Sequence, residues 1–312
     1  MFKNNLRAFN VTHNQTVSYL TRRFREVGIR PATRHGQNFL VDINLQKLLV
    51  ASAELEPRDV VLEVGTGTGS LTTMMAEQAG AVVTIEIDRH LYELASEELI
   101  DCPNVTMLLH DALKNKNHFD DRVIEAVRAQ MSAVPDARFK LVANLPFNVA
   151  TPVLSNLLSC PVVPSTMTAT IQKELADRIV ARPSTKDYNA LSIWMQSQSH
   201  TEIVRVLAPS VFWPRPKVAS AIIHVTVDME KQSRISNPTY WHHFVRAMFF
   251  HRRKFFRSVV LAAFKKHLDK QQVDALMAQH AFGPTTRAEE LDVPTMFAFC
   301  ESVRKAAPDW SL

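Results

Sequence analysis

Three glycines alternate with threonines at residues 65–69, directly after an apolar run, and this arrangement constrains the fold more than any other feature. Residues 60–64 read as a buried strand, and residues 71–78 have helical spacing. Glycines between a strand and a helix let backbone N–H groups and the start of the helix approach a ligand closely. The segment therefore predicts a strand, a ligand-binding loop and a helix of an α/β domain.

Strands and helices go on alternating through the first half of the chain. We expect strands at residues 60–64, 82–87, 105–110 and 139–143, and helices at residues 71–78, 90–99 and 122–131. Three more strands are expected at residues 167–171, 203–207 and 221–227. The alternation predicts an α/β fold with a doubly wound, Rossmann-like parallel sheet and helices on both of its faces.

The pattern changes after Asp228, where helical spacing returns at residues 240–267, 271–280 and 293–305. We therefore expect an N-terminal extension over residues 1–30, an α/β domain over residues 31–229 and a small C-terminal helical domain over residues 230–312. Within the extension, a helix is expected from residue 15 to residue 27. Three prolines between residues 209 and 216 predict a rigid loop.

Composition narrows the class of protein. No apolar run approaches the ~20 residues that span a bilayer, and the first residues lack the charged-then-apolar order of a secretory signal. We expect a soluble, cytoplasmic monomer without membrane contact. The three cysteines are too scattered for a disulfide framework or a metal site. The formal net charge of +5 favours a polyanionic partner.

Acidic residues end the second and third expected strands. Glu86 follows the glycine loop by roughly 20 residues, where a carboxylate can accept hydrogen bonds from both hydroxyls of a ribose. Asp111, at the matching end of the next strand, can accept from an adenine amine, although each acid alone also suits an exposed loop. Ser70 stands where a dinucleotide fingerprint requires glycine, which disfavours NAD. S-adenosylmethionine fits better, because its methionine tail needs no pyrophosphate site.

The tetrapeptide Asn144-Leu145-Pro146-Phe147 follows the fourth expected strand and suits a planar base. Asn144 offers an amide oxygen as acceptor, Pro146 restrains the backbone, and Phe147 supplies a ring for stacking. An ordinary strand-to-turn exit has the same composition. The exocyclic amine of adenine needs such acceptors before it can be alkylated, because its lone pair is delocalised into the ring. The position beside the expected donor site therefore favours methyl transfer to an adenine amine.

Basic side chains crowd one short stretch of the expected helical domain, at Arg246, His251, Arg252, Arg253, Lys254 and Arg257. Such a run is typical of a solvated helix face, and equally of a surface that holds RNA phosphates. The residues alone leave both interpretations open.

Taken in chain order, these motifs resemble one family. The resemblance is carried by residues 35–40 (HGQNFL), the glycine loop, Glu86, Asp111, residues 144–147 (NLPF), 216–221 (PKVASA), 252–254 (RRK) and 287–289 (RAE). Together they are similar to the ribosomal RNA adenine dimethyltransferases, which modify two adjacent adenosines near the end of small-subunit RNA. The resemblance covers nearly everything from residue 34 to residue 303.

The resemblance implies S-adenosylmethionine-dependent dimethylation of small-subunit ribosomal RNA, with a pre-ribosomal particle as partner. The donor contacts that it implies come from Asn38, Leu40, Gly65, Glu86, Asp111 and Asn144. In the catalytic tetrapeptide, the Asn144 side chain and the Leu145 carbonyl would accept from the target amine, next to Pro146 and Phe147. Phosphates of the RNA would contact Arg252, Arg253 and Lys254.

One residue departs from the pattern of the small-subunit enzymes: Phe147 stands where tyrosine is more usual. The related large-subunit enzymes of the macrolide-resistance type often carry phenylalanine there, and they are the first alternative. The PKVASA, RRK and RAE segments favour the small-subunit family. The second alternative is an RNA-binding assembly factor with secondary methylation activity. Neither family explains the extension before residue 31 or the long insertion at residues 114–138.

Overall fold

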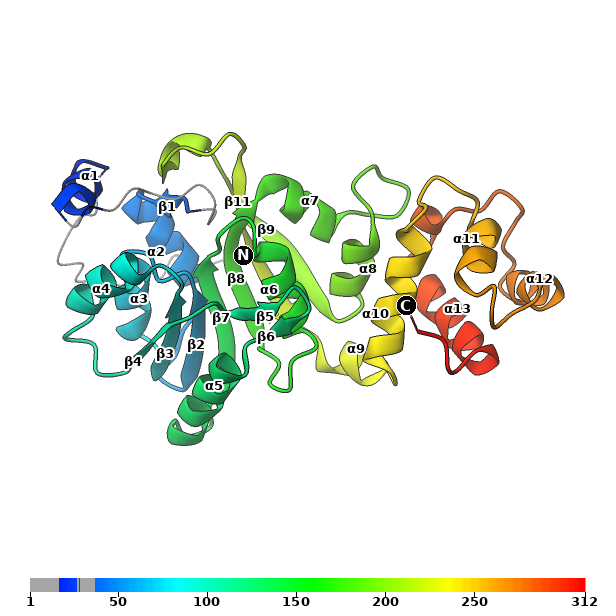
Figure 1. The fold of residues 1–312 in the computed structure, drawn as a ribbon, viewed down its shortest axis with the longest axis horizontal. Helices are drawn as coiled ribbons and strands as arrows, with labels where there is room; N and C mark the ends of the chain where they lie inside the picture. The colour runs from blue at the N-terminus through cyan, green and yellow to red at the C-terminus, as the bar shows by residue number, and fades with distance from the viewer. Residues whose placement is uncertain (1–16, 27, 29–36, 312) are drawn as a thin grey trace. The chain divides into compact units, whose positions relative to one another are not determined.

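The computed structural model describes residues 17–26, 28 and 37–311, and the chain divides into two compact units (Figure 1). Unit 1 comprises Met1–Ala176 and Glu202–Val227, and unit 2 comprises Asp177–Thr201 and Asp228–Leu312. We expected all of residues 31–229 in the α/β domain, so the assignment of residues 177–201 to the helical unit is a difference. Its physical reason is helix α8 (Ala190–Gln196), which packs against α10 (Pro238–Phe249).

One ring contact and one hydrogen bond join α8 and its C-cap residue to α10. The rings of Trp194 and His242 lie 4.6 Å apart between their centroids. The indole N–H of Trp241 donates to the hydroxyl of Ser197 at 3.0 Å. Because these side chains are part of one buried core, residues 177–201 belong with the C-terminal helices although the sequence places them between two strands of the sheet.

The sheet of the described chain has seven strands in the order β4-β3-β2-β7-β8-β11-β9. Their bounds are β2 (Asp59–Val64), β3 (Ala81–Glu86), β4 (Val105–Leu109), β7 (Arg138–Asn144), β8 (Thr166–Gln172), β9 (Ser199–Leu207) and β11 (Ser220–Val227). Strands β2, β3, β4, β7 and β8 run parallel, whereas β11 is antiparallel to β8. The α/β fold is confirmed, with an antiparallel strand added to the expected parallel sheet.

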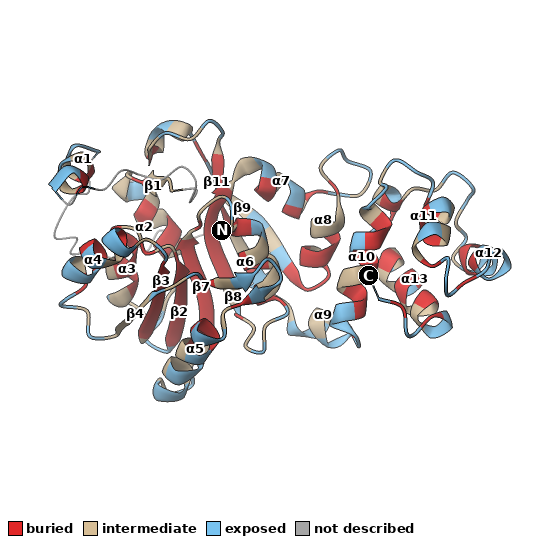
Figure 2. Ribbon diagram, viewed as in Figure 1, coloured by how far each residue is buried: buried red, intermediate tan, exposed pale blue. Residues whose placement is uncertain are grey.

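Helices cover both faces of the sheet, so its central strands are apolar on both sides (Figure 2). On one face, α2 (Ile43–Ser52) and α3 (Ser70–Ala76) pack over Val61 and Val142. Val60 and Leu62 point to the other face and are also fully buried. The remaining helices of unit 1 are α4 (Arg89–Glu98), α5 (Asp121–Ala133) and α6 (Ala150–Leu157).

The expected rigid loop at residues 209–216 contains ordered structure. A 3₁₀ turn, η2 (Pro209–Val211), leads into β10 (Phe212–Trp213), which pairs antiparallel with β1 (Phe39–Leu40). The long insertion likewise contains a β-hairpin, β5 (Leu113–Asn115) with β6 (His118–Phe119), followed by α5. Short strands of two or three residues carry little sequence signal, which is why neither the β1–β10 pair nor the β5–β6 hairpin was expected. The helix expected at residues 122–131 is present as α5.

Helix α1 (Val17–Glu26) is the part of the N-terminal extension that the structure describes, apart from residue 28. Its buried Leu20 and Phe24 pack with Leu91 and Leu94 of α4. The Phe24 ring also lies 5.2 Å from Phe39 and 5.4 Å from Trp213, centroid to centroid. The expected helix at residues 15–27 is thus helical over 17–26, and residues 15, 16 and 27 lie outside the described residues.

Unit 2 is helical, as expected of the C-terminal part. It contains the end of α7 (Lys173–Val180), then α8, α9 (Met229–Ser233), α10, α11 (Phe256–Ala263), α12 (Lys270–Gln279), η3 (Ala288–Glu290) and α13 (Val293–Ala306). The single helical run expected at 240–267 is divided, because α10 ends at Phe249 and the Phe256 N–H donates to the Thr286 carbonyl. Within the described residues, no helix is long and apolar enough to cross a membrane.

Candidate active site

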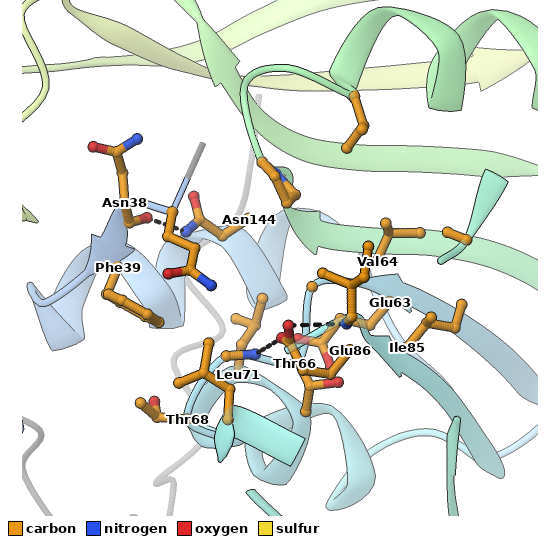
Figure 3. Close-up of a pocket in the computed structure, with 18 of the residues that line it drawn as sticks. Asn38, Phe39, Glu63, Val64, Thr66, Thr68, Leu71, Ile85, Glu86 and Asn144 are labelled. Carbon is orange, nitrogen blue, oxygen red and sulfur yellow. Dashed lines mark hydrogen bonds between the residues drawn. The ribbon is translucent and has the colours of Figure 1, made fainter. Parts of the chain in front are cut away.

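A cavity lies at the carboxyl ends of β2, β3 and β7, where the loops that follow these parallel strands converge (Figure 3). Seven of the expected catalytic and donor-binding residues line it: Asn38, Leu40, Gly65, Glu86, Asp111, Asn144 and Pro146. They come from segments spread over more than a hundred residues of the chain. The strand order places β2 between β3 and β7, and this brings the glycine loop, the acid and the tetrapeptide to one edge.

The glycine loop contacts the other motifs closely. Gly65 and Gly67 have φ values of +90° and +60°, in the left-handed region that favours glycine. A Cβ atom on Gly65 would lie 3.2 Å from the Pro146 ring, and one on Gly67 would lie 3.3 Å from the Phe39 ring. The glycines thus allow the loop to touch both the tetrapeptide and the Phe39–Leu40 strand.

Glu86 ends β3 and holds the glycine loop in place. One carboxylate oxygen accepts from the Gly67 N–H at 2.9 Å, and the other accepts from the N–H groups of Ile87 and Asp88 at 3.0 and 2.9 Å. Burial raises the pKa of Glu86, against the effect of these backbone donors. By the usual count of carboxylate lone pairs, the oxygen bonded to Gly67 retains one acceptor position.

A second buried carboxyl, Glu63, also lines the cavity and was not among the expected site residues. It is 1% exposed, and one of its oxygens accepts from the hydroxyls of Thr72 and Thr84, each at 2.6 Å. Burial raises the pKa of Glu63 to about 8, so its neutral form predominates at neutral pH. The signal in the sequence was an acid within the apolar run that precedes the glycines.

A hydrogen bond from the nitrogen fixes the orientation of the Asn144 side-chain amide, and the amide oxygen takes no part in that bond. Its nitrogen donates to the backbone carbonyl of Asn38 at 2.8 Å, the dashed line in Figure 3. Because only the nitrogen can donate to a carbonyl, the assignment of the two amide atoms is settled. The Asn144 oxygen is buried and has no hydrogen-bond partner among the described residues.

The other two members of the tetrapeptide do not line the cavity. Leu145 is 1% exposed, and its N–H donates to the Thr170 carbonyl at 3.2 Å, which continues the pairing of β7 with β8. The Phe147 ring lies 6.5 Å from that of Phe212 at an interplanar angle of 70°. The structure therefore places Asn144 and Pro146 at the cavity and gives Leu145 and Phe147 packing contacts beside it.

Two residues that were not predicted from the sequence, Gln46 and Leu20, also help to form the site. The buried side chain of Gln46 donates to the Leu40 carbonyl and accepts from the Ser70 hydroxyl at 2.8 Å, which ties β1 to the start of α3. Leu20 of α1 lines the cavity. Among the residues that were expected, Asp111 has an exposed carboxylate that accepts from the Leu113 N–H at 2.9 Å, which orients it at the cavity. A buried glutamine in a helix gives no pattern from which these contacts could be predicted.

In unit 2, the three residues expected to bind RNA have different environments. The Arg252 guanidinium pairs with Glu289 and donates to the carbonyls of Thr185 and Lys186. Arg253 and Lys254 are exposed, and their side chains make no ion pair with any residue that the structure describes. The structure thus assigns Arg252 to internal bonds and leaves its two neighbours facing solvent.

Comparison with known sequences gives a match to the family "Ribosomal RNA adenine dimethylase" over residues 30–305. The chain is 34% identical over 263 residues to "Ribosomal RNA small subunit methyltransferase A" of Halothermothrix orenii, covering 84% of each chain. It is also 34% identical over 267 residues to the protein of the same name from Moorella thermoacetica, covering 86% of this chain and 90% of that one.

Among solved structures, the fold is similar to that of a dimethyladenosine transferase from Plasmodium falciparum. The TM-score is 0.67 at 20% identity, covering 85% of this chain and 97% of that chain. A 23S rRNA methyltransferase, ErmE, gives a TM-score of 0.57 at 22% identity, covering 85% of this chain and 98% of that chain. At these identities the two structures support the fold, a Rossmann-like sheet with a helical part.

Proposed function

Because this chain belongs to the ribosomal RNA adenine dimethylase family, we propose that it methylates adenines of small-subunit ribosomal RNA with S-adenosylmethionine as donor. The product is the N6,N6-dimethyl form of two adjacent adenosines. The relatives at 34% identity are named for the small subunit, whereas the large-subunit enzyme is similar at 22% identity and in fold. The large-subunit alternative is therefore disfavoured, and Phe147 does not argue for it on its own.

The single observation that supports this function best is the buried oxygen of Asn144, which has no hydrogen-bond partner within the described ranges. Leaving a buried acceptor without a hydrogen bond costs roughly 1–3 kcal/mol, so such an atom calls for a donor from a ligand. An exocyclic amine of adenine carries two N–H donors. One of them would satisfy the Asn144 oxygen, and the nitrogen that forms the new bond would lie next to the cavity that Asn144 lines.

The residues present fit S-adenosylmethionine. Glu86 has an acceptor position for a ribose hydroxyl, Asp111 an acceptor for the adenine amine, and the glycine loop a close backbone surface. Because the Glu63 carboxyl is neutral, it adds a polar group to the cavity without placing a second buried negative charge next to Glu86. When bound, S-adenosylmethionine supplies a methyl group on a sulfonium sulfur, which is already a good leaving group.

The protein's contribution is then positioning rather than acid or base chemistry. The Asn144 oxygen and the Leu145 carbonyl accept hydrogen bonds from the two N–H groups of the amine. These bonds restore electron density to the nitrogen and favour the developing ammonium. Phe147 stacks on the target base. The adenine has to leave its stack to reach these groups, which costs least in a loop or at a helix end.

The partner that we propose is the assembling small subunit in the cytoplasm, bound by a monomer. Exposed cations of unit 2, Arg253 and Lys254, hold RNA phosphates, and such contacts position the RNA without reading its sequence. Selection of the two adenosines therefore depends on the shape of the particle. Sedimentation of the protein alone and with unmethylated small subunits measures both the oligomeric state and the partner.

Mapping of the modified bases tests the proposed function. The protein is incubated with labelled donor and either unmethylated small subunits or protein-free large-subunit RNA, and the labelled nucleotides are identified by digestion and mass spectrometry. We expect two adjacent dimethyladenosines in small-subunit RNA and none in large-subunit RNA. Label in large-subunit RNA alone, or in no adenine, contradicts the proposal.

A further inference from the structure

The turn between α10 and α11, residues 250–255, presents two large aromatic side chains to solvent. Phe250 is 81% exposed and Phe255 is 44% exposed, whereas Phe249 and Phe256, their sequence neighbours, pack inward to a greater extent. The Phe250 ring also lies 4.9 Å from the His251 ring, centroid to centroid, so the turn presents a group of aromatic rings rather than a single one. In the sequence, the exposed cations Arg253 and Lys254 lie between these two phenylalanines. We call residues 250–255 the aromatic turn.

Arg252 fixes the shape of the aromatic turn. Its guanidinium donates to Glu289 of η3 and to the carbonyls of Thr185 and Lys186. Within the turn, the Lys254 N–H donates to the His251 carbonyl at 2.8 Å. The Ser184 N–H donates to the Glu289 carbonyl at 2.7 Å, which joins the two segments that Arg252 contacts. A turn that is anchored in this way loses less conformational entropy when its exposed side chains bind a partner.

One more cation, Arg287, lies at the aromatic turn. The guanidinium carbon of Arg287 lies 5.7 Å from the centre of the Phe255 ring, a cation–π distance, and Glu290 is the nearest exposed acid in sequence. Counted over the two units, unit 2 carries 16 Lys and Arg against 11 Asp and Glu, whereas unit 1 carries 20 of each. All of the chain's net positive charge thus belongs to the unit that displays the exposed rings.

We propose that the aromatic turn binds unpaired nucleotides of RNA, with bases stacked on Phe250 and Phe255 and phosphates held by Arg253 and Lys254. This inference rests on the proposed function, since it names how the RNA substrate meets unit 2. Exposed rings interleaved with cations suit a single strand, because bases stack on rings while the backbone follows the charges. A duplex offers no free base face to a ring.

Stacking and charge make separable contributions to binding. Stacking of a base on an aromatic ring is worth roughly a tenfold change in affinity or more, and it does not depend on released counterions. A phosphate contact contributes a slope of roughly 0.7 in the logarithm of affinity against the logarithm of salt for single strands. Salt titrations of matched variants therefore report on the two kinds of side chain independently.

The test uses the full-length protein and a short RNA with a fluorescent adenine analogue, either single-stranded or annealed to its complement. The stacking variant is Phe250→Ala with Phe255→Ala, and the conservative variant replaces both by Trp. The charge variant is Arg253→Ala with Lys254→Ala. Ile100→Ala, in unit 1 and also 81% exposed before substitution, is the control for loss of an exposed apolar side chain.

We expect the stacking variant to bind the single strand about tenfold more weakly or worse, with an unchanged salt slope and unchanged duplex binding. The Trp variant should retain binding, and the charge variant should have a smaller slope on both RNAs. Thermal unfolding should be alike in all of them, because the replaced rings are exposed. If the double Ala variant unfolds early, Phe250→Ala alone, at the 81% exposed ring, replaces it and should bind the single strand more weakly than the wild type.

Three results overturn the inference: unchanged single-strand binding, equal loss on duplex, or loss on the ribosomal particle with normal binding to RNA, which indicates a protein contact instead. Failure of the proposed function looks different. It is read from the wild-type protein by mapping, as absence of methylated adenosine, whereas failure of the inference leaves wild-type methylation intact and the stacking variant binding like the wild type.

Discussion

The side-chain nitrogen of Asn144 donates to the backbone carbonyl of Asn38 at 2.8 Å, joining two residues 106 positions apart. This bond connects the end of β7 to the segment before β1, and it turns the amide so that the oxygen has no partner among the residues that the structure describes. The geometry of the acceptor is thus set by a residue outside the tetrapeptide.

Replacing Asn144 by Ala should reduce methylation by about a hundredfold or more, since it removes an acceptor that acts as the reaction proceeds. Donor binding, measured by calorimetry, should change much less. The matched control is Asn156→Ala on α6, outside the cavity, which should retain full turnover. Near-normal turnover of the Asn144 variant would show that its oxygen is not the acceptor.

Replacing Glu86 by Gln should weaken donor binding about tenfold and lower the stability by roughly 1–3 kcal/mol, because the amide offers one acceptor atom to three backbone donors. Those donors are the N–H groups of Gly67, Ile87 and Asp88. Calorimetry with S-adenosylmethionine and thermal unfolding measure the two effects. The control is Glu93→Gln, at an exposed position of α4. Unchanged donor affinity would refute a contact of Glu86 with the ribose.

Stability should depend on pH through Glu63. Its pKa is raised to about 8 by burial, from 4.5, so between these pH values the folded state holds a proton that the unfolded chain releases. The contribution of this proton to the free energy of unfolding is fully present below pH 4.5. It is lost as the pH rises toward 8, by up to about 5 kcal/mol. Thermal unfolding of the wild type and of Glu63→Gln from acid to mildly alkaline pH measures it. We expect a shallower decline in the variant, and parallel curves would exclude Glu63 as the source.

Replacing Phe24 by Ala should release α1 from the donor cavity. Phe24 is 2% exposed, and loss of such a ring costs about 3–5 kcal/mol, more than a ten-residue helix can supply by itself. Hydrogen exchange over residues 17–26 should accelerate, and donor affinity should fall because Leu20 no longer lines the cavity. Val17→Ala, at a 42% exposed position of the same helix, is the control. Faster exchange with unchanged donor affinity would show that α1 does not help to form the donor site.

Much of unit 1 could be predicted because its signals are local. An apolar run such as residues 60–64 indicates a strand that helices cover on both faces of the sheet. Glycines at 65, 67 and 69 indicate a loop with positive φ angles. Both features follow from short stretches of chain. The donor-site residues could also be placed, since the carboxyl ends of parallel strands meet at one edge. Glu63 could not be interpreted, because the pKa of a carboxyl depends on what surrounds it.

By itself, the sequence determined the α/β fold, the glycine loop and the residue types at the edge of the sheet, because strand and helix periodicity and glycine conformation are properties of neighbouring residues. Only the tertiary structure decided which polar atoms are already used. Arg252 is bound to Glu289 while Arg253 and Lys254 are not. In the described part of the chain, the Asn144 nitrogen donates to a carbonyl while its oxygen has no partner. Hydrogen bonds between residues far apart in sequence exist only once burial has brought them together, and they distinguish a residue that holds the protein from one that can hold its substrate.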